Sequence, residues 1–407
     1  MPPLLAVFAC ALFAQTPTVQ VLRFAKVWTA TNAPVMENAA IVLEGNRIAR
    51  VEKDSGKYAT GSTVIDLRRY AAIPGMIDAH THITYFWDGA AGTNPRRQPR
   101  RHPAVAVILA AENAKRTLQT GVTTVRDLNA SAGNDYALRD LIEMGKIVGP
   151  RIVAAGAGIG ARPAPPGVEG MRKMVEERLA AGSDVIKLFA STGGFEDVTG
   201  KQTLSYEEMR AAVDAAHAAG KRIAIHTYGP AGFRDAVKAG PDSIEHGADV
   251  DDSTLREMAR KRIWFVPTID HNRFYIDAAA EFQFAAGSAE GLTSYIARNL
   301  DTARRAHAAG VKFAMGSDAV YSMFGQNTRE LEWLVKAGLT NEEALLAATS
   351  HGAELLGMQD RIGKLAPGFL ADIVAVEGEP WKDVRAAING IRWVMKDGKA
   401  VSGTASR

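Results

Sequence analysis

Two histidines, His80 and His82, stand two positions apart in the stretch from Ala71 to Thr84. The short apolar run after Pro74-Gly75 predicts a buried strand, and side chains two positions apart on a strand point to the same side. Both imidazoles are therefore expected to converge on one point, which is a metal-ligand spacing. A His-x-His pair alone also recurs by chance near strand ends, so further ligands are needed to support a metal site.

Four later residues could join the two histidines. Lys187 lies within Val-Ile-Lys, His226 ends Arg-Ile-Ala-Ile-His, His246 ends Asp-Ser-Ile-Glu-His, and Asp318 closes Gly-Ser-Asp. Each has an ordinary structural alternative: a lysine with a buried stem, a satisfied interior histidine, or an aspartate that caps a helix. Their positions relative to the predicted strands decide between these interpretations.

The middle of the chain alternates short apolar runs with amphipathic helical patterns, which is typical of a parallel α/β fold. Candidate strands cover 73–79, 123–127, 151–155, 184–188, 222–226, 242–246, 262–266 and 311–315, and helical segments include 104–119, 205–219, 290–309 and 328–337. Eight strand–helix units predict a (β/α)8 TIM barrel over residues 73–362. An open doubly wound sheet is the rival, but no Gly-x-Gly-x-x-Gly turn follows an early strand.

In such a barrel, polar residues at the carboxyl ends of the strands gather at one face. The six candidates fall at or near the ends of five strands: His80, His82, Lys187, His226, His246 and Asp318. Because coincidence at all these positions is improbable, we interpret them as one metal site. His102, His217 and His307 lie in a loop or on helix faces, and we interpret them as surface residues.

Both ends of the chain are β-rich. Residues 19–72 contain apolar runs with a tight turn at Glu44-Gly45-Asn46, and residues 363–407 contain similar runs with a turn at Asp397-Gly398. We expect the two parts to complete one small β-sandwich, with the barrel inserted between them.

Composition sets the protein class. A net charge of +3 from 48 basic and 45 acidic residues, without a recognisable nucleic-acid module, argues against a nucleic-acid partner.

The first 15 residues form an apolar run too short to span a bilayer, and Ala14 precedes a plausible cleavage point. We therefore expect a signal peptide over residues 1–18, no stable membrane span, and an exported protein, periplasmic or secreted. The single cysteine, Cys10, lies inside this run, and its poor match to a lipobox argues against lipid attachment. Because the mature chain would then have no thiol, we expect no disulfide and no cysteine metal site.

The order His-x-His, strand-four lysine, histidine, histidine, aspartate resembles the amidohydrolase superfamily of metal-dependent hydrolases. Ile73-Pro-Gly-Met-Ile-Asp-Ala-His-Thr-His, Gly121-Val-Thr-Thr-Val-Arg-Asp and Gly363-Lys-Leu-Ala-Pro-Gly-Phe-Leu-Ala-Asp-Ile-Val are similar to the branch with imidazolonepropionase-like enzymes and metal-dependent Xaa-Pro dipeptidases. The similarity covers nearly everything after the leader.

The resemblance implies two divalent metal ions and a Lys187 that is carbamylated by carbon dioxide and bridges them. Nitrogen and oxygen ligands without sulfur favour zinc, with manganese and cobalt as alternatives. One ion would take His80, His82 and Asp318, and the other would take His226 and His246. A hydroxide shared by the ions would attack, with Asp318 as general base and acid. Tyr228 is the nearest additional donor for the oxyanion, unless it only anchors its loop.

The sequence favours hydrolysis of an amide bond, in a dipeptide of the Xaa-Pro type or an N-acyl amino acid. The same centre could serve a cyclic amidase, a lactonase or a phosphotriesterase. A non-catalytic exported metal-binding protein is the alternative of another class, and Asp318 argues against it because sequestration needs no general base. We expect a small-molecule substrate and a homo-oligomer.

A substrate with a free carboxylate would need a side chain of the protein that binds this group. The segment Asp270–Arg273 follows predicted strand seven, where Arg273 or His271 could bind that carboxylate, with Tyr228 sharing the task. The arginines from Arg96 to Arg101 lie in a Pro- and Gly-rich loop after strand one. They form a solvated charge run or at most steer anionic substrates.

Overall fold

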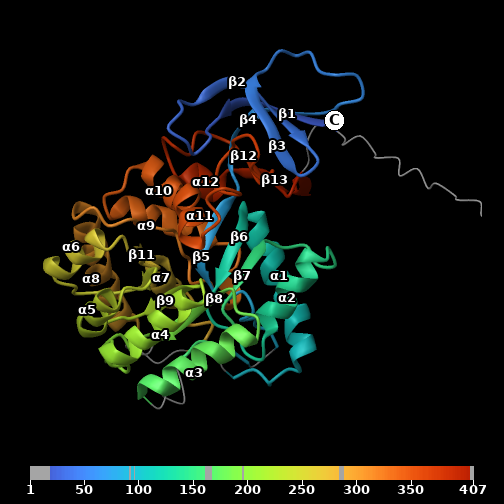
Figure 1. Cartoon of the computed structure of the whole chain (residues 1–407). Helices are drawn as coiled ribbons and strands as arrows, with labels where there is room; N and C mark the ends of the chain where they lie inside the picture. Colours follow the sequence, from blue (N-terminus) through green and yellow to red (C-terminus); the bar gives the residue numbers. More distant parts are fainter. Residues whose placement is uncertain are drawn as a thin grey trace, which may run out of the picture.

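The computed structural model describes residues 19–90, 93–95, 97–160, 167–194, 197–283 and 288–403. A sheet built from both ends of the chain lies on one side, and a larger layer of parallel strands with surrounding helices lies on the other (Figure 1). The expected signal peptide, Cys10 and Arg96 lie outside the described residues. Among the described residues, no helix combines the length and apolarity needed to cross a membrane.

The terminal sheet joins the two ends of the chain, as the sequence predicted. It contains β1 (Val19–Val27), β2 (Met36–Glu44), β3 (Arg47–Lys53), β4 (Thr63–Pro74), β12 (Ile373–Val376), β13 (Ile391–Lys396) and β14 (Lys399–Ser402). The junction is the antiparallel pairing of β12 with β4, where Val374 lies opposite Ile73.

The terminal sheet differs in one respect from the expected sandwich. Its strands follow one another in a single sheet, in the order β14-β13-β12-β4-β1-β2-β3, because β12 pairs directly with β4. The two ends of this sheet nevertheless approach each other, since Arg47 of β3 forms a bridge with Leu370, just before β12. Phe24, Ile41 and Trp393 then share one buried core.

The α/β layer contains seven parallel strands in two sheets. One sheet consists of β5 (Met76–Thr81), β6 (Val122–Asp127) and β7 (Arg151–Ala154); the other consists of β8 (Val185–Phe189), β9 (Arg222–His226), β10 (Ser243–Glu245) and β11 (Trp264–Val266). Neither sheet closes on itself. Two backbone contacts connect the first sheet to the second: Ile159 forms a bridge with Leu188, and the N–H of Asp184 donates to the carbonyl of Ala154 at 2.8 Å.

Residues 311–315, which the sequence predicted as strand eight, do not form a continuous strand. Phe313 forms a bridge with Phe265 of β11, whereas Ala319 forms one with Thr81 of β5. The backbone thus contacts β11 first and β5 six residues later, and no run of consecutive residues pairs with either strand. Isolated bridges link neighbouring strands in chain order, as expected for a TIM barrel. The closed barrel itself stays a prediction.

Helices cover the outside of this layer (Figure 1). They are α1 (Pro103–Gln119), α2 (Asn134–Glu143), α3 (Gly167–Ala180), α4 (Tyr206–Ala218), α5 (Pro230–Ala239), α6 (Asp252–Arg260), α7 (Ile269–Asp277), α8 (Ser288–Ala308), α9 (Glu330–Lys336), α10 (Asn341–Ala347), α11 (Ser350–Leu356) and α12 (Arg385–Asn389), with 3-10 turns η1 (Tyr321–Met323) and η2 (Asn327–Arg329). The four helical segments named from the sequence are confirmed to within two residues at each end.

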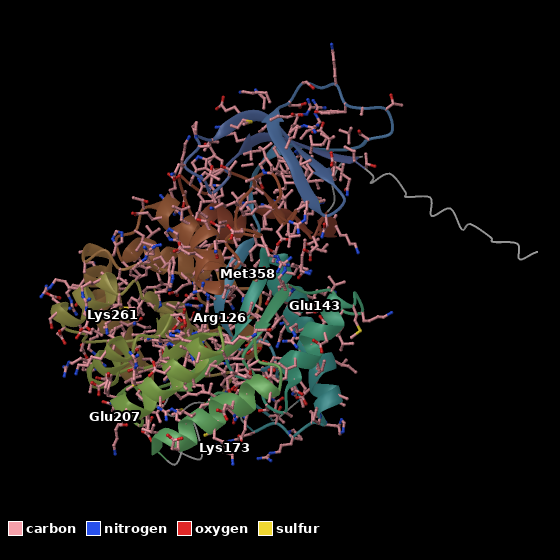
Figure 2. All side chains as sticks on the ribbon, viewed as in Figure 1. Arg126, Glu143, Lys173, Glu207, Lys261 and Met358 are labelled. Atoms are coloured by element: carbon pink, nitrogen blue, oxygen red, sulfur yellow. The ribbon has the colours of Figure 1, made fainter. Side chains whose placement is uncertain are left out.

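Local sequence explains where such helices begin and which side faces solvent. α4 starts at a capping box in which Ser205 and Glu208 satisfy each other's backbone N–H groups. Lys173 of α3 and Glu207 of α4 are exposed and point outward, whereas Arg126 of β6 lies buried among the strands (Figure 2). The strands therefore bring polar side chains into an interior that the helices close off.

Candidate metal centre

Three predicted ligands converge at the carboxyl end of β5. Nε2 of His82 lies 3.0 Å from Oδ1 of Asp318, and Nε2 of His80 lies 3.5 Å from the same oxygen. The backbone N–H of Asp318 donates to the carbonyl of His80 at 2.7 Å, which fixes the two segments side by side. All three side chains are buried, and their nearest ligand atoms lie within 4.8 Å of one another.

Hydrogen bonds to the other ring nitrogens decide which atoms face this point. Nδ1 of His80 lies 2.8 Å from Oε2 of Glu245, and Nδ1 of His82 lies 3.4 Å from the carbonyl of Asn129. Since carboxylate and carbonyl oxygens only accept, both Nδ1 atoms must carry the proton in the neutral rings. Two Nε2 lone pairs and the Asp318 carboxylate then face each other, an arrangement that fits a bound cation.

The second pair of histidines completes the cluster. The ring centroids of His226 and His246 are 4.5 Å apart, and those of His80 and His246 are 5.1 Å apart. Nδ1 of His246 also lies 4.0 Å from Oδ2 of Asp318. Burial lowers the pKa of His80 to about 4 and those of His226 and His246 well below the usual value, each with a contribution from nearby charges. His80, His226 and His246 are therefore neutral near pH 7, the form that binds metal.

Lys187 lies close enough to this cluster to act electrostatically on His80, His226 and His246. Its side chain is 2% exposed, and Nζ has no hydrogen-bond partner among the described residues. Burial lowers the pKa of Lys187 to about 8, although Glu245 and Asp318 act in the opposite direction. An unpaired buried ammonium is costly, so this position fits a lysine whose amine is modified. We use the name metal centre for His80, His82, Lys187, His226, His246 and Asp318.

A sequence model of the amidohydrolase family matches residues 71–401, which include all six residues of the metal centre. The chain belongs to the amidohydrolase family. Its match covers the α/β layer and the C-terminal strands of the terminal sheet.

Relatives of this amidohydrolase include several hydrolases. A crystal structure of a Xaa-Pro dipeptidase with bound methionine in the active site is 30% identical, with a TM-score of 0.86 over 95% of this chain and 100% of that one. A prolidase structure in complex with N-methylphosphonate-L-proline is 28% identical, with a TM-score of 0.84 over 95% and 100%. The ochratoxinase of Aspergillus niger is 29% identical over 90% of this chain and 84% of that protein.

A buried ionic network supports the centre of this amidohydrolase, and the sequence did not predict it. Glu245 Oε2 lies 2.8 Å from Nδ1 of His80, and Oε1 accepts from Arg126 at 3.0 Å and from Ser243 at 2.5 Å. Burial would raise the pKa of Glu245, but Arg126 and His80 hold it at about 2. Glu245 directly precedes the predicted ligand His246, and this position in the sequence could have indicated a role for Glu245.

A second buried carboxylate, Asp78, orders the loop that carries Asp318. Its oxygens accept from the N–H of Ser317 at 2.8 Å, from the Ser317 hydroxyl at 2.5 Å and from Asn327 at 3.0 Å. Burial raises the pKa of Asp78 to about 6, while these donors oppose the rise. Asp78 therefore stabilises the Gly-Ser-Asp turn from the strand that also carries His80.

Backbone strain also gathers here. Asp318 has φ = 51°, His246 has φ = 68° and Thr268 has φ = 49°, a left-handed conformation that non-glycine residues rarely adopt. The Thr268 hydroxyl lies 2.6 Å from Nδ1 of His246. Such strain persists only where the surroundings impose it, and it clusters at functional sites.

Tyr228 lies beside the metal centre, as expected. It is 1% exposed, its ring stacks on Tyr295 at 4.5 Å, and its centroid is 4.9 Å from that of His246. Burial raises the pKa of the Tyr228 hydroxyl well above its usual value, so the group remains a proton donor.

The strand-seven segment is divided between two environments. His271 faces the centre: Nε2 lies 3.3 Å from Oδ2 of Asp318, and Nδ1 lies 2.7 Å from the Asp318 carbonyl. Arg273 instead donates to both oxygens of Asp270, at 2.9 and 2.8 Å, and pairs with Asp277. Its guanidinium is thus held by carboxylates of its own helix, and none of these contacts belongs to the metal centre.

The other cations and histidines named from the sequence lie outside the cluster. Arg97 and Arg100 are exposed, and Arg101 pairs with Asp88. His102 caps α1, His217 lies 3.0 Å from Asp242, and His307 lies 3.7 Å from Glu343. The exposure of Arg97 and Arg100 is consistent with a solvated charge run, and the steering of anionic substrates by this loop stays a prediction.

Proposed function

We propose that this amidohydrolase is a binuclear metal-dependent hydrolase that cleaves the amide bond of a dipeptide or an N-acyl amino acid. The observation that carries the proposal is the buried amine of Lys187, which has no hydrogen-bond partner among the described residues and lies within electrostatic reach of Asp318 and three of the histidines. The similarity to a Xaa-Pro dipeptidase and a prolidase supports the substrate class.

Lys187 would serve as a bridging ligand once carbamylated. With a pKa of about 8, roughly a tenth of the amine is neutral at pH 7. The neutral nitrogen adds to the carbon of carbon dioxide, an N–C bond forms, and one proton leaves to solvent. The product is an anion, which removes the positive charge that would repel divalent cations.

The remaining ligands divide into two sets. His80, His82 and Asp318 would hold one ion, and His226 and His246 the other, with zinc favoured by nitrogen and oxygen donors. Bound ions of this kind lower the pKa of water and polarise a carbonyl.

Asp318 is the proposed general base and acid. Burial would raise its pKa, but His271 and His80 hold it well below the usual value, so it is a carboxylate near pH 7. It can take the proton of the attacking water and give it to the leaving nitrogen.

His271 is placed to assist this transfer. Because the Asp318 carbonyl only accepts, Nδ1 of His271 carries a proton, and Nε2 lies 3.3 Å from Oδ2 of Asp318. A proton shared between Nε2 and Oδ2 would let His271 assist Asp318 as it takes and releases the proton of water. The Tyr228 hydroxyl is the proposed donor to the oxyanion that develops during attack.

The test is a screen of purified, metal-loaded protein against Xaa-Pro dipeptides and N-acyl amino acids, with lactones and phosphotriesters as controls. We expect turnover of the amides, and we expect Asp318→Asn to lose at least about a hundredfold in kcat. Turnover of lactones or phosphotriesters alone would show that the enzyme acts on esters rather than on amides. An active Asp318→Asn enzyme would remove Asp318 from the mechanism.

We also propose that the protein is exported, on the basis of the apolar run before Ala14. Mass spectrometry of natively expressed protein provides the test. An intact Met1 on a cytoplasmic protein would contradict the proposal.

A further inference from the structure

A cleft of about 1150 Å³ lies at the opposite end of the strands from the metal centre. We call it the basal cleft. Arg151 at the start of β7, Asp184 just before β8 and Lys221 just before β9 line one side of it, and the terminal sheet lines the other. His226 ends β9, five residues beyond Lys221, so the metal centre is separated from this wall by about 16 Å of extended chain. The two sites are therefore distinct.

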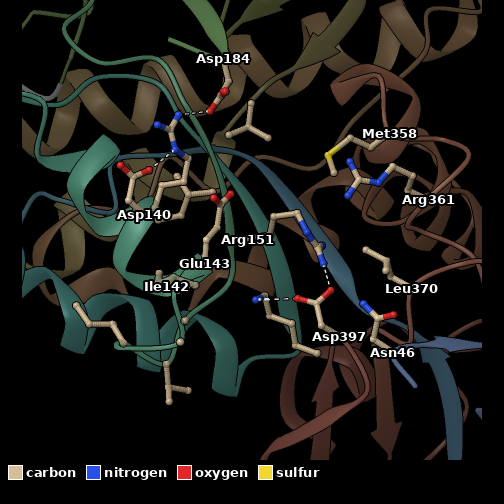
Figure 3. Close-up of a pocket in the computed structure, with 18 of the residues that line it drawn as sticks. Asn46, Asp140, Ile142, Glu143, Arg151, Asp184, Met358, Arg361, Leu370 and Asp397 are labelled. Atoms are coloured by element: carbon tan, nitrogen blue, oxygen red, sulfur yellow. Dashed lines mark hydrogen bonds and ion pairs between the residues drawn. The ribbon is translucent and has the colours of Figure 1, made fainter. Parts of the chain in front are cut away.

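The basal cleft is strongly cationic. Seven basic residues and four carboxylates line it, a net charge of +3 that equals the excess of the whole chain. Three of the carboxylates are already paired, Asp140 and Asp184 with Arg139, and Asp397 with Arg151 and Lys396 (Figure 3). These pairs leave the charge of other basic residues uncompensated.

Four cations of the cleft lack a carboxylate partner among the described residues: Arg47, Lys221, Arg361 and Lys399. Arg47 donates to the carbonyl of Gly368. The side chain of Arg361 lies beside Met358 (Figure 3). The N–H of Leu370 donates to the Arg361 carbonyl at 2.9 Å, and Leu370 also forms a bridge with Arg47. The two guanidinium groups therefore come from adjoining segments of one wall.

Apolar side chains lie within the same wall. Met358 and Leu370 line the cleft beside Arg361 (Figure 3). Val148 lines the cleft as well and is 57% exposed, an unusual exposure for a valine. A ligand could thus rest an apolar body against these side chains while its charged groups meet the cations.

We propose that the basal cleft binds a compact organic polyanion, a molecule with two or more phosphate or carboxylate groups. The planar fork of arginine matches either group bidentately, and lysine supplies further point charges. Arg47, Arg361 and Lys399 are exposed, so binding weakens as salt screens them. The proposal is independent of the reaction at the metal centre.

Isothermal titration of full-length, metal-loaded protein tests the proposal with two probes that chelate metals weakly. Fructose 1,6-bisphosphate carries two phosphates, and tricarballylate carries three carboxylates. We expect at least one probe to bind at low ionic strength, and we expect Arg361→Gln/Lys399→Gln to weaken that binding roughly tenfold or more. Binding of one probe alone identifies the anionic group and supports the proposal.

A matched control removes one arginine and one lysine elsewhere. Arg256 of α6 and Lys173 of α3 are exposed and outside the cleft, so Arg256→Gln/Lys173→Gln should bind the probe as the unaltered protein does. Circular dichroism and metal content verify that both variants fold. Absence of binding for both probes, or equal weakening in the two double variants, overturns the proposal.

Discussion

Lys187 has an environment that an ordinary lysine would not tolerate. His80, His226 and His246 lie within electrostatic reach of its amine, which has no hydrogen-bond partner among the described residues, and burial lowers the pKa of Lys187 to about 8. In the proposed carbamate form, the side chain would instead offer oxygen ligands to bound cations. The environment of the amine therefore fits the proposed modification.

Replacing Lys187 tests that interpretation directly. Lys187→Ala should lose bound metal and activity together, since the two ligand sets lose their bridge. Formate or acetate should restore part of both by occupying the space of the carbamate. Metal analysis and kcat with and without added carboxylate provide the measurement. Lys312→Ala is the control, because Lys312 pairs with Glu354 away from the centre. Two metals and full activity in Lys187→Ala would falsify the bridge.

The sequence offers Arg273 or His271 for binding the substrate carboxylate, and the ion pairs of Arg273 favour His271 for that role. Arg273 holds Asp270, whose Oδ1 also accepts from Trp333 at 2.8 Å. Arg273→Met should therefore loosen α7 and reduce kcat/KM by a similar, roughly several-fold factor for a dipeptide and for its C-terminally amidated analogue. A loss confined to the free carboxylate would restore the original assignment.

The residues of the candidate metal centre could be proposed from the sequence because most of them fall at or just after the ends of predicted strands, where a barrel would aim them at one face, whereas Lys187 lies inside its strand. Glu245 and Asp78 were missed for a physical reason. Their partners, His80 and Ser317, lie 165 and 239 positions away along the chain, and no local pattern encodes such pairs. Burial of a charge becomes visible only once the fold supplies its partner.

At the scale of elements, the turn between 311 and 319 has to fit between β11 and β5. Gly316 permits this: a Cβ there would lie 2.4 Å from Cγ1 of Val266 and 2.8 Å from Cβ of His80. The sequence predicted a strand over 311–315 because the run is apolar and bounded by turn residues. The backbone instead forms isolated bridges, from Phe313 to β11 and from Ala319 to β5.

Gly316→Ala should therefore displace His80 and lower both stability and metal content. Overpacking of this kind costs about 1–3 kcal/mol. Gly291 of α8 offers a matched control, because a Cβ there would meet only Val198, at 3.6 Å. Gly291→Ala should stabilise the protein by up to about 1 kcal/mol through helix propensity. Urea unfolding with metal analysis measures both, and equal responses would contradict the steric account.

At the scale of the whole molecule, the terminal sheet and the α/β layer meet at Arg151. This first residue of β7 donates to Asp372 at 2.9 Å and to Asp397 at 2.5 Å, both in the terminal sheet region. The sequence predicted that the two ends form one unit because both carry strand and turn patterns. It could not predict this junction, since the three residues are far apart in the chain and the charges are ordinary in isolation.

Arg151→Met should lower the free energy of unfolding at pH 7 by about 3–5 kcal/mol, because Asp372, 3% exposed, then keeps only the hydrogen bond from the Asp397 N–H and remains buried without a counter-charge. Arg260→Met is the control: Arg260 pairs only with Glu257, at 3.8 Å on the surface, and should cost at most about 1 kcal/mol. Urea unfolding at pH 7 compares the two variants with the unaltered protein.

The pH dependence of the same variant separates charge from packing. Burial would raise the pKa of Asp397, but Arg151 and Lys396 outweigh it and the pKa lies below its ordinary value. A lowered pKa in the folded state adds stability above the unfolded value of about 3.9, and this stability is lost as pH falls through the folded value. In Arg151→Met the pKa of Asp397 rises toward the unfolded value, so that contribution shrinks. The stability difference between the unaltered protein and Arg151→Met should therefore narrow as pH falls below about 4. A difference that stays constant from pH 7 to pH 3 would show that the arginine acts through packing of its stem rather than through its charge.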